Sequence, residues 1–190
     1  MLQQQGVLEV LVGDDGSTDG TVRWLSQQGV DYIARKNTKY SLNPTIYHPL
    51  IEKAKGDIII FSGGEMACPM VDGVRRLAAR CDTTTISQAA VYNHKKPSGG
   101  SAVADWVVDP DESTWRIRGH DDILYTGPTR PAPFMFFAAF PKELWERTGG
   151  YDRELTEASD AEFAHRAMRQ GITFQGVGDV VAYHLTHPKR

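Results

Sequence analysis

Two short acidic motifs follow apolar runs in the first third of the chain. Asp14 and Asp15 open the polar stretch DDGSTDGT directly after the apolar run at residues 7–13, and Glu65 follows the run at residues 57–61. Open α/β sheets hold their ligands at the carboxyl ends of the strands. A carboxylate there accepts hydrogen bonds from a ligand, and beside phosphates it binds a hard cation such as Mg²⁺ or Mn²⁺.

Each of these motifs also has a purely structural interpretation. Asp14, Asp15 and Ser17 are residue types that shape Asx turns and cap helices. Glu65 is equally compatible with a solvated loop before a helix. The residues alone leave both interpretations open.

The second half of the chain adds a further carboxylate and two histidines. Asp160 falls in the first turn of a helix predicted to start at Ser159, where the helix dipole favours the ionised form that a general base requires. The structural alternative is that acidic residues stabilise helix starts, and Ser159 with Glu162 has capping-box spacing. His184 and His187 are candidate metal ligands, and a continued strand would direct only one of them toward a site.

Alternating strands and helices must position these residues. The apolar and turn patterns predict strands at residues 7–13, 30–34, 57–61, 86–92, 134–140, 172–176 and 180–185. They predict helices at residues 21–29, 47–55, 69–80, 141–150 and 159–171. This order predicts an α/β fold with a mostly parallel central sheet flanked by helices.

The composition excludes several classes of protein. With 190 residues, 41% of them hydrophobic and 24% charged, the chain suits a single globular domain. A net charge of −3 does not favour nucleic acid as a partner. No apolar run approaches the roughly 20 residues that span a bilayer and no signal peptide is visible, so a cytoplasmic location is expected. A predicted helix keeps Cys68 and Cys81 too far apart for a disulfide.

Three segments, taken in order, resemble the motifs of family 2 glycosyltransferases with the GT-A fold. EVLVGDDGSTDGT is similar to their nucleotide-binding strand and loop, and AKGDIIIFSGGE to the strand that leads to their D-x-D metal motif. GGYDRELTEASDAEFAHRAMRQG is similar to their signature of Gly-Gly-Tyr-Asp followed by Glu-Asp, Arg and Gly. The resemblance covers most of residues 7–171. It implies a GT-A fold and transfer of a sugar from a nucleotide-diphosphate donor to an acceptor hydroxyl.

The resemblance assigns the donor site to the first half of the chain. It implies that Asp14 and Asp15 contact the base and ribose, with Ser17 and Gly64 also at the donor. Glu65 matches the last Asp of D-x-D and would hold Mn²⁺ or Mg²⁺. A UDP sugar is the favoured donor.

The catalytic residues fall in the second half. Asp160 matches the Asp of the Glu-Asp pair, which is the base of inverting family members, and Arg166 matches the family's Arg, interpreted as structural. His184, in preference to His187, matches a late histidine that serves as a further metal ligand. Residues 1–95 would then be the donor half and residues 96–190 the acceptor and catalytic half of one domain. The acceptor would be a saccharide or another hydroxyl compound, met by an irregular segment that contains Trp106, Trp115 and Tyr125.

The chain departs from the family pattern at several positions. Gly63 stands in place of the first Asp of D-x-D, Ser159 in place of the Glu of the pair, and His48 where members often have Asn. The run at residues 7–13 matches the family's second strand, so the first strand has no match and a sheet edge is left open. Two other hypotheses follow: a non-catalytic protein that binds nucleotide sugars, and an oligomeric scaffold, such as a homo-oligomer, that covers the open edge.

Overall fold

The computed structural model of the chain describes residues 4–35, 43–93, 106–108, 115–117, 137–155 and 159–184. In the first half the elements are β1 (Leu11–Asp14), α1 (Thr21–Gln27), β2 (Asp31–Ala34), α2 (Asn43–Lys53), β3 (Ile58–Ser62), β4 (Met66–Ala67), α3 (Gly73–Ala78) and β5 (Thr85–Asn93). In the second half they are β6 (Trp106–Val108), β7 (Trp115–Ile117), β8 (Phe137–Pro141), α4 (Lys142–Thr148), α5 (Ser159–Arg169) and β9 (Thr173–His184).

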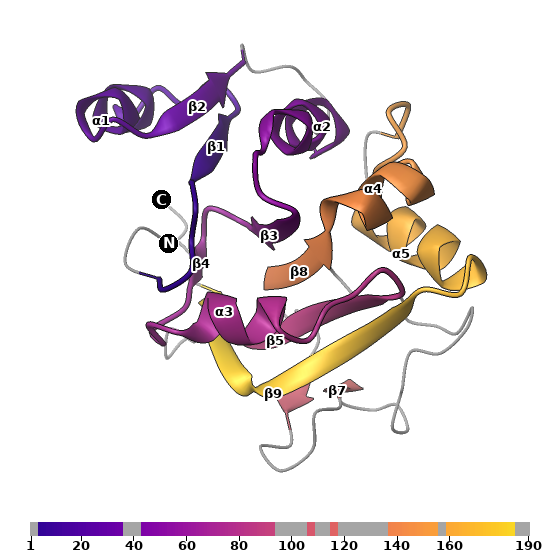
Figure 1. The fold of residues 1–190 in the computed structure, drawn as a ribbon. Coiled ribbons are helices and arrows are strands. Elements are labelled where there is room, and N and C mark those ends of the chain that lie inside the picture. The colour runs from indigo at the N-terminus through magenta and orange to yellow at the C-terminus, as the bar shows by residue number, and fades with distance from the viewer. Residues whose placement is uncertain are drawn as a thin grey trace.

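The main sheet has five strands in the order β3-β8-β5-β9-β4, with helices beside it (Figure 1). Strands β1 and β2 form a separate parallel pair, and β6 and β7 form a small antiparallel one. Within the described residues, β1 pairs with β2 alone and β3 with β8 alone. Each of the two strands therefore has an edge without a described strand partner, as the open-edge expectation predicted.

The sheet is mixed, so the expectation of a mostly parallel sheet was wrong, although the α/β class and the flanking helices are confirmed. β5 and β9 are parallel, but β8 is antiparallel to both β3 and β5, and β4 is antiparallel to β9. A helical crossover within one sheet leaves the strands that it joins parallel, as β3 and β5 are on either side of α3. β8 follows a long segment without a predicted helix, so alternation along the sequence gives no information on its direction.

Several boundaries also differ from the sequence expectation. The two strands expected at residues 172–176 and 180–185 form one strand, β9, whose register against β5 shifts between Ala89 and Ala90. Such a shift adds residues to one strand and bends it without ending it. Helix α3 begins at Gly73, after β4, so Pro69 precedes the helix that it was expected to open.

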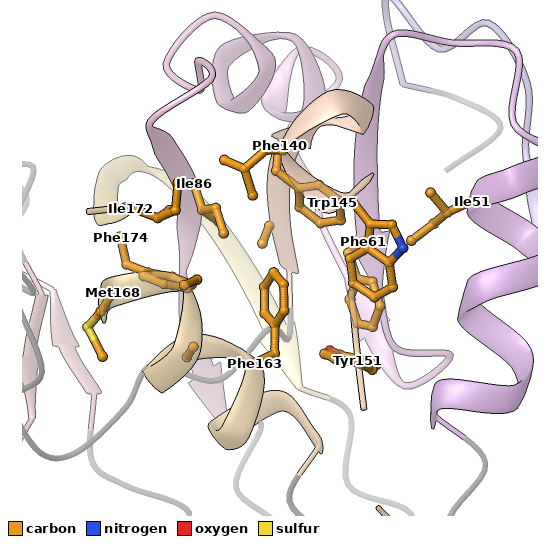
Figure 2. Close-up of a cluster of buried hydrophobic side chains, with 14 residues drawn as sticks. Ile51, Phe61, Ile86, Phe140, Trp145, Tyr151, Phe163, Met168, Ile172 and Phe174 are labelled. Carbon is orange, nitrogen blue, oxygen red and sulfur yellow. The ribbon is translucent and has the colours of Figure 1, made fainter. Parts of the chain in front are cut away.

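The core lies on both faces of β8. Ala138 and Phe140 belong to a cluster with helices α4 and α5, whereas Phe137 and Ala139 belong to a second cluster with α3. Side chains alternate between the faces of a strand, so a strand covered on both faces reads as a continuous apolar run. Figure 2 shows the first cluster, in which residues from α2, β3, β5, β8, α4, α5 and β9 meet.

The β1–β2 pair is attached to the rest of the fold mainly through α2. A Cβ on Gly13 would overlap Ile46 Cγ2 and lie 3.0 Å from Leu50 Cδ1, so only glycine lets the helix approach β1 this closely. The Glu9 side chain also accepts a hydrogen bond from the backbone N–H of Lys55, at 2.5 Å. The position of Asp14 and Asp15 therefore depends on α2.

Two expectations drawn from composition can be compared with the structure. Cys68 and Cys81 are both free thiols, as predicted. In the described part of the chain, none of the helices has the length and apolar character needed to cross a bilayer.

Candidate functional site

Glu65 lies in a tight turn between β3 and β4. The turn is closed by a hydrogen bond of 3.2 Å from the backbone N–H of Met66 to the Gly63 carbonyl. The Glu65 side chain folds back over Gly63, because a Cβ on that glycine would lie 2.8 Å from Glu65 Oε1. The carboxylate is thus held near the carboxyl end of β3, where the sequence placed it.

Tyr47 is a half-buried residue of α2 whose pKa depends on both Glu65 and Asp160. Burial, followed by the negative charges of Glu65 and Asp160, raises the pKa of Tyr47 to about 12. The β3–β4 turn and the start of α5 thus each place a negative charge within electrostatic range of one phenol. Tyr47 packs on Phe61 of β3, with ring centroids 4.2 Å apart.

Asp160 occupies the first turn of α5, as predicted, but its environment differs from the expected one. Burial raises the pKa of its carboxyl, and the 2.9 Å hydrogen bond from the Ala161 N–H opposes that shift only in part. Desolvation therefore outweighs the backbone hydrogen bonds that favour the ionised form, and the carboxyl holds its proton more tightly than expected. A carboxylate with a raised pKa is a stronger base than an ordinary aspartate, which suits proton abstraction near neutral pH.

Asp14 shapes the loop after β1. Its side chain is 4% exposed, and its Oδ1 accepts hydrogen bonds of 3.0 Å from the backbone N–H groups of Gly16 and Ser17. This is the Asx-turn alternative, and it leaves Asp14 as the residue that fixes the backbone of the loop. Asp15, by contrast, has a buried Oδ1 without a hydrogen-bond partner among the described residues.

A buried carboxylate oxygen without a partner is costly unless a ligand or water satisfies it. Asp15 is therefore the residue of this loop best suited to accept from a bound molecule. Ser17 is exposed at the same loop, and its N–H is already used by Asp14.

Gly64 precedes Glu65 in the turn, and the backbone of His184 pairs with the residue after Glu65. Gly64 is exposed, and a Cβ there would meet nothing within 4 Å, so its backbone is accessible to a ligand. His184 is paired with Met66 in the β4–β9 register, next to Glu65 along the chain. His187 lies outside the described residues, as do most residues of the expected acceptor segment.

The donor set suits a hard cation bound together with phosphates. Within the described ranges, no group of three His, Cys, Asp or Glu side chains is arranged to hold an ion by itself. Mg²⁺ and Mn²⁺ usually take one or two carboxylates and complete their shell with substrate phosphates and water. Glu65 satisfies that requirement as an oxygen ligand.

Arg166 binds α5 to the turn after α4. Its guanidinium donates to the carbonyls of Thr148 and Gly150 and makes a two-point ion pair with Glu162, at 2.7 and 2.9 Å. The expected capping box was wrong, because Glu162 pairs with Arg166 and Ser159 Oγ has no partner among the described residues. These contacts support the structural interpretation of Arg166.

Tyr47, His48 and Tyr151 are the residues that the sequence analysis failed to place at the site. Tyr151 is fully buried, and burial together with the charge of Asp160 raises its pKa well above the ordinary value. His48 joins it to α2, with Nε2 2.7 Å from the Tyr151 carbonyl and its ring against Trp145. Two signals were present in the sequence: Tyr151 is the Tyr of the Gly-Gly-Tyr-Asp signature, and His48, directly after Tyr47, stands where family members often have Asn.

Comparisons with known proteins can now be set beside this geometry. No protein-family model matches the chain. The hyaluronan synthase of Pasteurella multocida is 30% identical over 95 residues, which cover 47% of this chain and 9% of that protein. The chondroitin synthase of Escherichia coli is 26% identical over 214 residues, which cover 95% of this chain and 30% of that protein. The chain thus spans less than a third of either relative.

Solved structures agree with the sequence matches. A structure of GalNAc-T7 with UDP, GalNAc and Mn²⁺ has a TM-score of 0.66 at 18% identity and covers 95% of this chain and 38% of that one. The mannosyltransferase PcManGT from Pyrobaculum calidifontis, with GDP-Man and Mn²⁺, has a TM-score of 0.65 at 19% identity and covers 100% of this chain and 51% of that one. The chain has the GT-A fold of glycosyltransferases, and its sequence is similar to family 2-like synthases.

Proposed function

We propose that the chain is the catalytic core of a glycosyltransferase that moves a sugar from a nucleotide diphosphate, with a UDP sugar favoured, to an acceptor hydroxyl. The observation that carries the proposal is that the charges of Glu65 and Asp160, which come from separate elements, both raise the pKa of the half-buried Tyr47 phenol. The two synthase relatives and the shared fold support this class of reaction. Residues 1–95 then serve the donor and residues 96–190 the acceptor.

The donor binds across the ends of β1 and β3. Asp15 accepts hydrogen bonds from the base or ribose with its unpaired Oδ1, and Asp14 holds the loop in which Asp15, Gly16 and Ser17 lie. Glu65 would hold Mn²⁺ or Mg²⁺ against the diphosphate, with His184, whose backbone pairs with Met66, as the candidate further ligand. When bound, the cation neutralises the charge that develops on the leaving diphosphate.

Asp160 acts as the base. It removes the proton of the acceptor hydroxyl while that oxygen attacks the anomeric carbon and the bond from that carbon to the diphosphate breaks. One displacement of this kind inverts the anomeric carbon. Tyr47 stays protonated throughout because its pKa is about 12, so it acts as a neutral neighbour of both carboxylates.

Calorimetric titration of UDP, GDP and dTDP, each with and without Mn²⁺, tests the donor site. We expect cation-dependent binding of one nucleotide and its loss in Glu65→Ala. NMR of the transfer product then tests the mechanism. A product that retains the donor's anomeric configuration, or unchanged turnover in Asp160→Asn, would contradict it.

The second candidate is a protein without turnover, which either binds nucleotide sugars or forms an oligomeric scaffold. Gly63 supports it, because the turn then carries one carboxylate where the D-x-D motif carries two. In the described part of the chain, β1 and β3 each have an edge without a strand partner, which supports the scaffold. Nucleotide binding without transfer or slow donor hydrolysis would favour this candidate, and light scattering would show any oligomer.

A further inference from the structure

Gly63 and Glu65 share one small space at the end of β3. A Cβ built on Gly63 would lie 2.8 Å from Glu65 Oε1, 3.1 Å from Cδ and 3.3 Å from Oε2. All three neighbours belong to the Glu65 carboxyl group. The carboxylate thus occupies the place that a side chain at position 63 would take.

A side chain at position 63 would move the carboxylate and leave the fold intact. The atoms in the way are the far end of a flexible side chain, which rotates away at low cost. Gly63 is absent from the described glycines with positive φ, so its backbone conformation suits alanine. The first group that a side chain at position 63 would displace is therefore the Glu65 carboxylate.

We infer that Gly63 is a positioning residue that gives the Glu65 carboxylate its place over the end of β3, where that carboxylate serves the proposed cation–nucleotide site. The inference rests on the proposed function and deepens it. Glutamate is one methylene longer than aspartate, so it can fold back over a glycine. In this turn, Gly63 and Glu65 stand where the D-x-D motif has two aspartates.

The nature of the ligand follows from the number of protein oxygens in the turn. Glu65 supplies the carboxylate there, and within the described part of the chain no set of three acidic, histidine or cysteine side chains could retain a cation alone. Under the proposed function, phosphate oxygens and water complete the coordination shell. Cation and nucleotide should bind together, each strengthening the affinity of the other by the same factor.

The experiment measures Mn²⁺ bound to the protein by electron paramagnetic resonance, with Mn²⁺ alone and with UDP, GDP or dTDP added. The variants are Gly63→Ala, Glu65→Ala and the double variant, with Gly56→Ala as the matched control. Gly56 lies before the same strand, has no positive φ and would place its Cβ at an ordinary 3.5 Å from the Ile58 carbonyl. Circular dichroism and thermal denaturation verify that each variant folds.

We expect Gly63→Ala to weaken binding of the cation–nucleotide complex by about 10- to 100-fold, the range found when the support of a metal ligand is removed. Gly56→Ala should bind like the unmodified protein. Once Glu65 is alanine, the change at Gly63 should have no further effect, because its effect acts through that carboxylate.

The outcomes separate the inference from the proposed function. If the unmodified protein binds none of the three nucleotides with Mn²⁺, the proposed function and the inference both fail. If it binds one, Glu65→Ala loses it and Gly63→Ala does not, the positioning role alone is refuted. Equal losses from Gly63→Ala in the presence and absence of Glu65 would refute it too, and tight binding of Mn²⁺ alone would refute the joint binding.

Discussion

Asp160 combines burial with a position at the amino end of a helix, and burial has the larger effect on its protonation. The pKa of its carboxyl is raised, so the proton is held to a higher pH than in an ordinary aspartate. The base form is the one that acts in transfer. The proposed activity should therefore depend on pH through this residue.

Turnover should rise with pH as Asp160 loses its proton and then level off. The midpoint of the rise should lie above the ordinary aspartate pKa, because burial raises that of Asp160. Asp160→Asn should lower kcat by about 10²- to 10⁴-fold, the usual contribution of a general base. The rise of turnover with pH should be absent in this variant. The measurement is a profile of kcat against pH. If the Asn variant still showed the rise of kcat with pH, Asp160 would not be the base.

The raised pKa of Asp160 also affects stability: the ionised carboxyl that serves catalysis makes the folded protein less stable. A group with a pKa raised by folding adds stability below its unfolded pKa and loses that contribution as pH rises through the folded value. Asp160→Asn should therefore raise the melting temperature at neutral pH and have little effect in acid.

Asp82 provides the control with opposite sign. The N–H and hydroxyl of Thr84, at 2.7 and 2.8 Å, lower the pKa of Asp82. Asp82→Asn should lower the melting temperature at neutral pH, with the difference vanishing as pH falls through the lowered pKa. Thermal denaturation at several pH values tests both variants, and the same sign for both would contradict the assigned environments.

Part of the candidate site could be predicted from residues and part could not. Asp160 and Glu65 were placed correctly because each follows a clear pattern, a helix start and a strand end. Tyr47 was missed because its role comes from charges on the β3–β4 turn and α5, which lie far apart in the sequence. For Asp14 the sequence left a ligand contact and an Asx turn both open, and the structure shows the hydrogen bonds of the Asx turn.

At the scale of elements, the turn after α4 fixes how α5 sits on the sheet. Gly150 has φ of +63°, and a Cβ there would lie 2.6 Å from Trp145 Nε1, with ring carbons closer still. Its carbonyl accepts from Arg166 at 2.6 Å. Gly150 thus combines a positive φ, a close contact with Trp145 and a hydrogen bond from Arg166.

Gly150→Ala should therefore be far more damaging than the same change at Gly171. Gly171 also has a positive φ, +82°, but a Cβ there meets nothing within 4 Å, so its substitution costs about 1 kcal/mol of backbone strain. Gly150→Ala adds overlap with Trp145, for which overpacked cores typically lose a further 1–3 kcal/mol or so. Urea unfolding measures both, and equal losses would contradict the role of the Trp145 contact.

The order of helices and strands was predictable, whereas the sheet was not. Periodicity and turn residues report on local conformation, so the expected helices near α1, α2, α4 and α5 are present. The position of β8 between β3 and β5 depends on pairing with distant residues. Its apolar run shows that it is buried on both faces and contains nothing that specifies neighbour or direction.

At the scale of the whole molecule, the described chain divides into a well-buried sheet and a less buried β1–β2 pair. β8 is buried along its length, whereas β1 and β2 are only partly covered and Leu25 is the buried residue of α1. Figure 1 shows this pair and α1 at one side of the molecule, away from β5 and β9. The proposed donor site would bridge the two parts, with Asp15 on one and Glu65 on the other.

Hydrogen exchange should therefore be faster in β1 and β2 than in β5, β8 and β9, because local opening is easiest where little apolar surface is buried. Mn²⁺ with the cognate nucleotide should slow exchange at the end of β1 and in the β3–β4 turn together. A ligand at about 100 times its Kd stabilises the bound state by about 2.7 kcal/mol, enough to slow exchange that requires release of the ligand. Exchange measured by mass spectrometry, with Glu65→Ala as control, tests this. Protection of one part alone would show that the ligand does not link β1 to the main sheet.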